Sequence, residues 1–145
     1  MPYAAESDLD AKWGAELVTL AAWNPATSAR DEGRIAVALG AAAAVMDGYF
    51  ARRYPLPLAP SAGGALLLTN INCDLAMGLL SNTPGTRNEI VAEAEKRALS
   101  FLRDVGDGKA AIPLLPSAAE PQVAPNEPVL IADRHEWARD RMRAL

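Results

Sequence analysis

The chain has 145 residues, a formal net charge of −4 and a pI of about 5.0, with 50% hydrophobic and 22% charged residues. This length suits one domain, and the composition is that of a soluble globular protein. The acidic balance gives no sign of the basic face that nucleic-acid binding requires, and a single cysteine excludes an internal disulfide.

The first helical segment is predicted to begin at Ser7, whose side chain can cap free backbone N–H groups. Gly14 is expected to divide this segment into two short helices, because glycine weakens a helix interior. The pair Asn24-Pro25 then predicts a turn.

The second helix is predicted to have Ser28 as its cap and an apolar stripe of helical period from Ile35 to Phe50. Arg52 and Arg53 follow this stripe, where positive charge suits the C-terminal end of the helix dipole. The alanine-rich stretch 38–46 is shorter than the ~20 apolar residues that span a bilayer, so no membrane segment is expected there.

A proline-rich crossing follows this helix, with the sequence YPLPLAP. Pro55, Pro57 and Pro60 stop the helix and favour a stiff, extended backbone. Residues 57–60 match the minimal PxxP ligand of SH3 domains, but Arg53 is wrongly placed for either binding orientation. The crossing is therefore interpreted as part of the architecture.

A third helix is expected from about residue 64 to residue 80, with an apolar stripe that includes Leu79. Asn70, Asn72 and Asp74 interrupt its apolar run. Because polar residues are costly inside a bilayer, this pattern argues against a membrane span.

The fourth helix has the clearest local signals. Thr86 and Glu89 have the spacing of a capping box, and an apolar stripe begins at Ile90. Gly106 and Gly108 are expected to end the helix.

The character of the chain changes after residue 109. Five prolines between 113 and 128 exclude a regular helix or a central strand, so an extended arm is expected. Residues 129–133 suit one short β-strand, and 134–145 suit a short terminal helix. The predicted fold class is all-α: a small bundle of about four helices over residues 1–109, followed by a proline-rich arm with a C-terminal anchor over residues 110–145.

Catalysis has few candidate residues, because the chain has one cysteine, Cys73, and one histidine, His135. The two could meet only if the tail folded back, and a buried packing cysteine is the favoured interpretation. Zinc sites need clusters of such residues, and the carboxylates form no catalytic pattern. The sequence therefore predicts no enzyme activity, no metal and no cofactor.

The tail combines arginines with large apolar side chains, and these residue types are enriched at binding hot spots. The alternative is a solvated helix with a tryptophan that docks on the body, and the sequence leaves both open. The candidate partner interface consists of Arg134, Trp137, Arg139, Arg141, Met142, Arg143 and Leu145.

Several stretches together form a pattern: Lys12-Trp13-Gly14 near the start, Asp47-Gly48-Tyr49 and Arg53-Tyr54-Pro55-Leu56-Pro57 in the middle, then Asn72-Cys73-Asp74, Gly108-Lys109 and the basic end 139–145. In this order they resemble the small head–tail connector, or adaptor, proteins of Mu-like prophages and tailed phages. Trp13 stands where that family usually has phenylalanine. The signature residues that the resemblance assigns to architecture are Trp13, Gly14, Asp47, Tyr49, Arg53, Tyr54, Pro55 and Pro57.

The resemblance implies a ring of subunits, with twelve as the expected number, placed under the portal protein in the neck of a phage or phage-like particle. Its partners would be the portal, neighbouring copies of itself and the next neck or tail-completion protein. DNA would pass through without specific binding, which an acidic body would permit by repelling phosphates. The protein would be made in the bacterial cytoplasm. The alternative function is a small cytoplasmic helical module that binds another protein or acts as a regulator.

Overall fold

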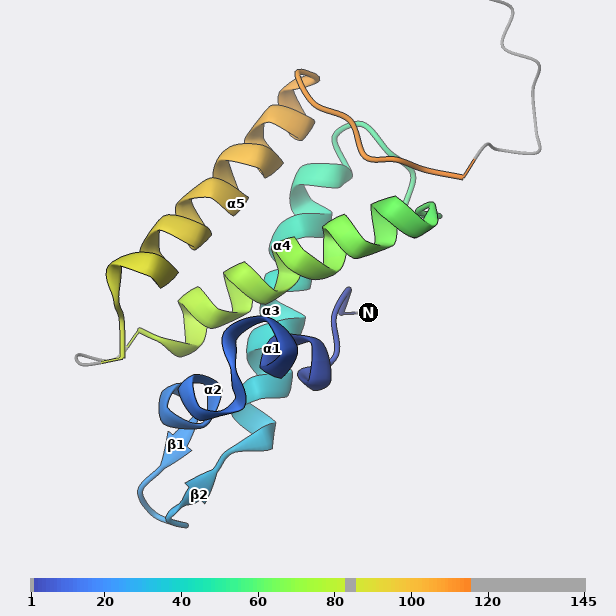
Figure 1. The fold of residues 1–145 in the computed structure, drawn as a ribbon. Coiled ribbons are helices and arrows are strands. Elements are labelled where there is room, and N and C mark those ends of the chain that lie inside the picture. The colour runs from blue at the N-terminus through green and yellow to red at the C-terminus, as the bar shows by residue number, and fades with distance from the viewer. Residues whose placement is uncertain (1, 83–85, 116–145) are drawn as a thin grey trace, which may run out of the picture. The chain divides into compact units, whose positions relative to one another are not determined.

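The computed structural model describes residues 2–82 and 86–115, and within them the chain forms five helices and one short hairpin (Figure 1). The all-α fold class is confirmed. The predicted strand at 129–133 and terminal helix at 134–145 lie outside the described residues. The elements are α1 (Glu6–Trp13), α2 (Ala15–Ala21), β1 (Trp23–Asn24), β2 (Ala29–Arg30), α3 (Glu32–Phe50), α4 (Ala62–Leu80) and α5 (Glu89–Asp107).

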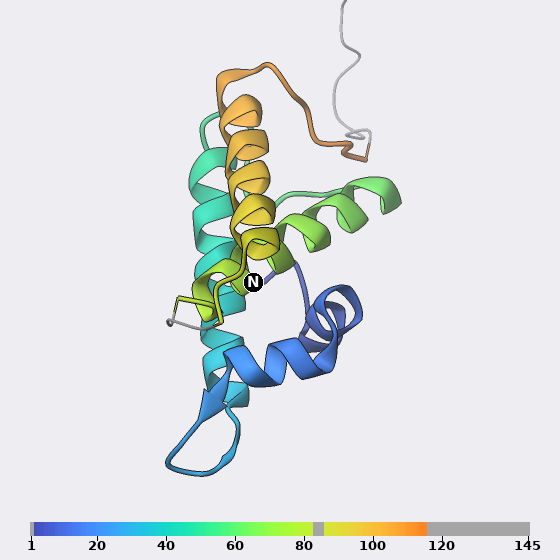
Figure 2. The same ribbon diagram turned by 60° about the vertical axis from the view of Figure 1, so that its left-hand side comes forward.

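Three helices of 19 residues each, α3, α4 and α5, build the body and pack against one another. Helix α4 crosses α3, and α5 lies beside the C-terminal half of α3 (Figures 1 and 2). The short helices α1 and α2 cover α4 at the other end of the body. The largest fully buried side chains are those of Phe50, Leu9, Ile35, Met46, Leu68, Met77 and Leu102.

Helices α3 and α4 are long and apolar enough to cross a membrane when judged by length and composition alone. Core helices of globular proteins pass the same test. In their most apolar windows 39% of α3 and 56% of α4 are buried inside the fold, and α4 also buries the polar Asn72. Packing inside the fold therefore accounts for more than half of the α4 window and for a smaller share of the α3 window.

Gly14 divides the first helical segment as predicted. Its φ of 85° lies in the region that side chains disfavour, and it ends α1 while preceding α2. The predicted turn at Asn24-Pro25 is confirmed as the tip of the β1–β2 hairpin, in which Trp23 pairs with Arg30. Arg30 forms ion pairs with Glu6 and with Asp10, the latter at 2.9 Å, and these pairs tie the hairpin to α1.

Two predicted caps near the N-terminus are wrong. Helix α1 begins one residue before Ser7, and Asp8 in its first turn accepts a hydrogen bond from the backbone N–H of Ala5 at 2.8 Å. Ser28 lies in the hairpin loop with a φ of 50°, so it cannot cap α3. Asp31 takes that role and accepts a hydrogen bond from the backbone N–H of Arg34 at 3.0 Å.

The predicted capping box of α5 is also wrong. The cap is Asn88, which accepts a hydrogen bond from the backbone N–H of Val91 at 2.8 Å, so Glu89 is the first helical residue rather than the third. Thr86 therefore precedes the cap by two residues. Gly108 ends α5 in the left-handed conformation as predicted, but Gly106 lies inside the helix.

Two residues of the predicted apolar stripes do not face the core. Leu79 is 45% exposed and Ile90 is 69% exposed. Both lie in the turn of a helix next to the α4–α5 loop, where no neighbouring element among the described residues covers them. Periodicity gave the correct face for the middle of each helix and failed at these ends.

Cys73 is buried in α4, as the sequence favoured, and the predicted absence of a catalytic pair with His135 stays untested because His135 lies outside the described residues. Burial raises the pKa of the Cys73 thiol from 9.0 to about 11. Because the folded pKa is the higher one, the thiol contributes stability that is fully present below pH 9 and is lost as the pH rises towards 11.

We expect the Cys73 thiol to react very slowly with Ellman's reagent at about pH 8 in the native protein, because the thiolate is the reactive species. Reaction in guanidinium chloride should be complete at the rate of a free cysteine. The measurement is the absorbance of the released thiolate with and without denaturant. Rapid labelling of the native protein would contradict the burial of Cys73.

Candidate functional site at the base of the C-terminal segment

The signature motif in the middle of the chain lies in the crossing segment, residues 51–61, which joins α3 to α4. The backbone N–H of Ala51 donates to the carbonyl of Asp47 at 2.9 Å, and that of Tyr54 donates to the carbonyl of Phe50 at 2.8 Å. These bonds complete the last turn of α3. Pro55, which follows directly, cannot continue the helix because it has no N–H.

The two arginines of the crossing segment face the end of α5 as well as that of α3. Arg52 pairs with Asp107 at 3.7 Å. The side chain of Arg53 lies so close to Gly108 that a Cβ atom there would be 3.0 Å from its Nη1 atom. Arg52 and Arg53, which were expected to interact with the C-terminal end of the α3 dipole, therefore also link the C-terminal ends of α3 and α5.

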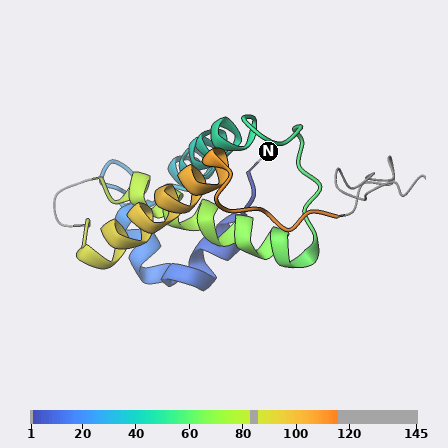
Figure 3. The same ribbon diagram turned by 90° about the horizontal axis from the view of Figure 1, so that it is seen from above.

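The arm base, residues 108–115, runs from the end of α5 to the start of α4 and pairs there with the crossing segment (Figure 3). The backbone N–H of Ser61 donates to the carbonyl of Pro113 at 3.0 Å, and that of Leu115 donates to the carbonyl of Ala59 at 2.9 Å. Both segments are extended, and Pro60 and Leu114 face each other as an antiparallel bridge. Pro60 has no N–H to donate, and it is tolerated here because the crossing segment pairs with the arm base along one edge only.

Ser61 and Gly64 make this pairing close. The Ser61 hydroxyl donates to the carbonyl of Pro113 at 3.1 Å and also accepts from the backbone N–H of Gly64 at 3.2 Å, as the cap of α4. A Cβ atom on Gly64 would lie 2.0 Å from the carbonyl oxygen of Pro113. Only glycine therefore allows the arm base to reach α4.

Ile112 fixes the arm base to the core, since its side chain is only 5% exposed. Its backbone N–H donates to the hydroxyl of Tyr54 at 3.4 Å. Tyr54, from the signature motif, thus connects the crossing segment to the arm base. We call the whole arrangement of crossing segment and arm base the junction.

The N-terminal residues before α1 contact α3 close to the junction. The Tyr3 hydroxyl donates a hydrogen bond to Asp47, and its ring meets that of Phe50 edge-on at 6.1 Å between centroids. Thr69 donates to the carbonyl of Tyr3 at 2.9 Å. Burial, followed by the bond to Asp47, raises the pKa of the Tyr3 hydroxyl.

The signature residues divide into two groups in space. Arg53, Tyr54, Pro55 and Pro57 lie at the junction, and Asp47 and Tyr49 lie in the last turn of α3 directly before it. Trp13 ends α1, and Gly14 separates α1 from α2. Sequence reasoning missed Ser61, Gly64 and Ile112. Nothing local distinguishes Gly64, which Pro113 approaches closely, from Gly63, which has open space around it. The predicted interface residues 134–145 lie outside the described residues and stay predictions.

The junction offers architecture rather than chemistry. Its polar groups are backbone amides, the Tyr54 and Ser61 hydroxyls, Arg52, Arg53 and Lys109. Within the described parts of the chain, no group of three His, Cys, Asp or Glu side chains could hold a metal ion. The arrangement can hold residues 108–115, where the C-terminal segment begins, in a fixed position on the body.

Comparison with known proteins identifies the family. No curated protein matches the chain. The family model described as Bacteriophage Mu, Gp36 matches residues 3–131, a range that begins at Tyr3, contains the whole junction and stops before the predicted anchor at 134–145. Because this match spans most of the chain, the protein belongs to the bacteriophage Mu Gp36 family.

Proposed function

We propose that this member of a phage protein family is a structural adaptor, or head–tail connector. In this proposal it forms a ring under the portal in the particle neck, links the portal to the next neck or tail component and lets DNA pass through. The observation that supports the proposal most is the junction. It holds the base of the C-terminal segment with two backbone hydrogen bonds, the Ser61 side chain and the buried Ile112.

A fixed base favours binding by the residues that follow it. Holding Leu115 in place fixes the point at which the chain leaves the body, and such preorganisation lowers the entropy cost of binding a partner. In a ring, several such segments act on one partner, and their linkage raises the overall affinity without new contacts. The arginines and Trp137 would provide the anchor.

One observation favours the alternative, a small helical protein-binding or regulatory module. An apolar groove of about 590 Å³ lies between α3 and the C-terminal end of α4. A groove of this kind can accept an amphipathic helix. A stable one-to-one complex with a host protein, together with absence from purified particles, would favour this function over the adaptor.

The adaptor proposal is tested by deleting residues 129–145 and purifying particles made in the presence of the truncated protein. We expect the amount of protein in the particles to fall by more than about tenfold, the factor that 1.4 kcal/mol of lost binding produces. The helical body should keep its circular dichroism spectrum and its melting temperature, because the contacts of residues 3–115 are unchanged. Quantitative mass spectrometry of the particles provides the measurement.

The control replaces residues 129–145 with a glycine-serine segment of the same length, which preserves chain length but removes the arginines and Trp137. It should fail in the same way as the deletion. Normal incorporation of either variant would exclude the terminal segment as the anchor. Absence of the full-length protein from particles would overturn the adaptor function itself.

A further inference from the structure

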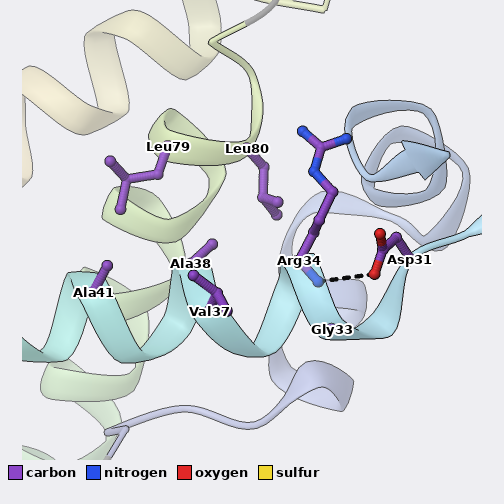
Figure 4. Close-up of a pocket in the computed structure, with 8 residues that line it drawn as sticks. All are labelled: Asp31, Gly33, Arg34, Val37, Ala38, Ala41, Leu79 and Leu80. Atoms are coloured by element: carbon purple, nitrogen blue, oxygen red, sulfur yellow. Dashed lines mark hydrogen bonds between the residues drawn. The ribbon is translucent and has the colours of Figure 1, made fainter.

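The groove between α3 and α4 is an uncovered apolar surface of the described body (Figure 4). Val37, on its α3 side, is 72% exposed, and Leu79 enters it from α4. Figure 4 shows Leu79 projecting from α4 and Val37 from α3. The lining is completed by Asp31, Gly33, Arg34, Ala38, Ala41 and Leu80.

One end of the groove carries two charged side chains, Arg34 and Asp31. The Asp31 carboxylate accepts hydrogen bonds from the backbone N–H of Arg34 at 3.0 Å and from the Asn24 amide at 3.3 Å. The Arg34 guanidinium donates to the carbonyl of Trp23 at 3.3 Å and forms no ion pair with any residue of the described ranges. It extends away from Asp31 beside the groove (Figure 4).

A second apolar patch, formed by α2 and β1, carries a negative charge. Leu20 is 58% exposed and Trp23 is also exposed, and Glu16 lies beside them on the same surface. Glu16 forms no ion pair within residues 2–82 and 86–115. This patch therefore combines two large apolar side chains with a carboxylate that has no ion pair, while the groove combines an apolar hollow with the Arg34 guanidinium, which has none either, and the Asp31 carboxylate.

We propose that the groove of one copy receives Leu20 and Trp23 of the next copy, with Arg34 of the first meeting Glu16 of the second. The inference rests on the proposed ring, since a ring closes through head-to-tail contacts that use two different faces of each subunit. Tryptophan is a preferred centre of such contacts, and complementary charge sets their register. The occupant is thus a second copy of this chain.

Cross-linking in the full-length protein tests this contact. Val37→Cys and Leu20→Cys variants are made separately and together, and each is treated with a short bis-maleimide reagent. We expect the double variant to form a ladder of linked subunits and a mixture of the two single variants to form only dimers. Neither single variant should link to itself, and the buried Cys73 should not react.

The matched control pairs Val37→Cys with Ile90→Cys, because Ile90 is about as exposed as Val37 but lies on α5. This pair should give no linked product. Self-linking of the Val37→Cys variant would overturn the inference in favour of a two-fold contact through the groove. Absence of linked products both in concentrated protein and in assembled particles would also overturn it.

A charge exchange provides the second measurement. Arg34→Glu and Glu16→Arg should each reduce the yield of linked dimers several-fold, and the two changes combined should restore it. No recovery in the combined variant would overturn the predicted pairing. If particles contain the protein but no cross-link forms, this contact is wrong while the adaptor function stands. If the protein forms a ladder but never enters particles, the contact stands while the adaptor function is wrong.

Discussion

Replacing Gly64 with alanine should detach the arm base from the body. The new Cβ atom would lie 2.0 Å from the Pro113 carbonyl oxygen, and that atom belongs to backbone, so it cannot rotate away. Displacing Pro113 breaks its bonds to Ser61 and exposes Ile112, whose burial alone contributes about 1.5–3 kcal/mol. We expect the free energy of unfolding to fall by about 2 kcal/mol or more.

The neighbouring residue provides a control with the opposite sign. A Cβ atom on Gly63 would meet nothing within 4 Å, and alanine is the better helix former. Gly63→Ala should therefore stabilise the protein by up to about 1 kcal/mol. Denaturant unfolding measures both variants, and limited proteolysis between residues 108 and 115 shows whether the arm base is released. Equal effects at the two positions would contradict the close approach of Pro113.

The Gly64→Ala variant also links the junction to function. If a fixed base is what makes the C-terminal segment effective, this variant should enter particles less efficiently although its residues 116–145 are unchanged. Gly63→Ala should enter normally. Normal incorporation of a Gly64→Ala protein with a released arm base would show that binding does not need the junction.

The largest loss of stability is expected for Phe50→Ala, at about 3–5 kcal/mol, the usual cost of truncating a buried phenylalanine. Phe50 is the largest fully buried side chain, and its ring contacts that of Tyr3. Its backbone carbonyl accepts the bonds from Arg53 and Tyr54 that complete α3. The substitution removes the packing below the junction as well as a part of the core.

Phe101→Ala is the matched control, because Phe101 is only partly buried on α5. The same truncation there should cost less than half as much, since fewer contacts are lost. Urea unfolding followed by far-ultraviolet circular dichroism compares the two variants. Similar losses for both would mean that the region around Phe50 is not the centre of the core.

Much of the fold follows from local properties of the chain. Prolines after Tyr54 must end a helix, Gly108 supplies a left-handed end, and apolar residues at helical spacing define the buried faces of α3, α4 and α5. The family resemblance read from these same motifs is confirmed at the level of a Mu-type phage protein. The roles of ring, portal binding and terminal anchor remain proposals.

The candidate site could be predicted only in part. The sequence placed Arg53, Tyr54 and Pro55 in one architectural motif, but it could not show that Pro113 lies against Gly64. The predicted cap of α3, Ser28, was wrong, and Asp31 takes its place. Residue type alone suits both positions, and the hairpin places Ser28 in a loop.

The sequence by itself determined where helices form and which side of each is apolar, because dihedral preference and periodicity act between residues close in the chain. Only the tertiary structure decided that Leu79 stays exposed, that Arg52 pairs with Asp107 and that residues 59–61 meet 113–115. Such contacts join residues about fifty positions apart, where loop-closure entropy and the fit of side chains select among many possible pairings. Local patterns carry no information about that choice.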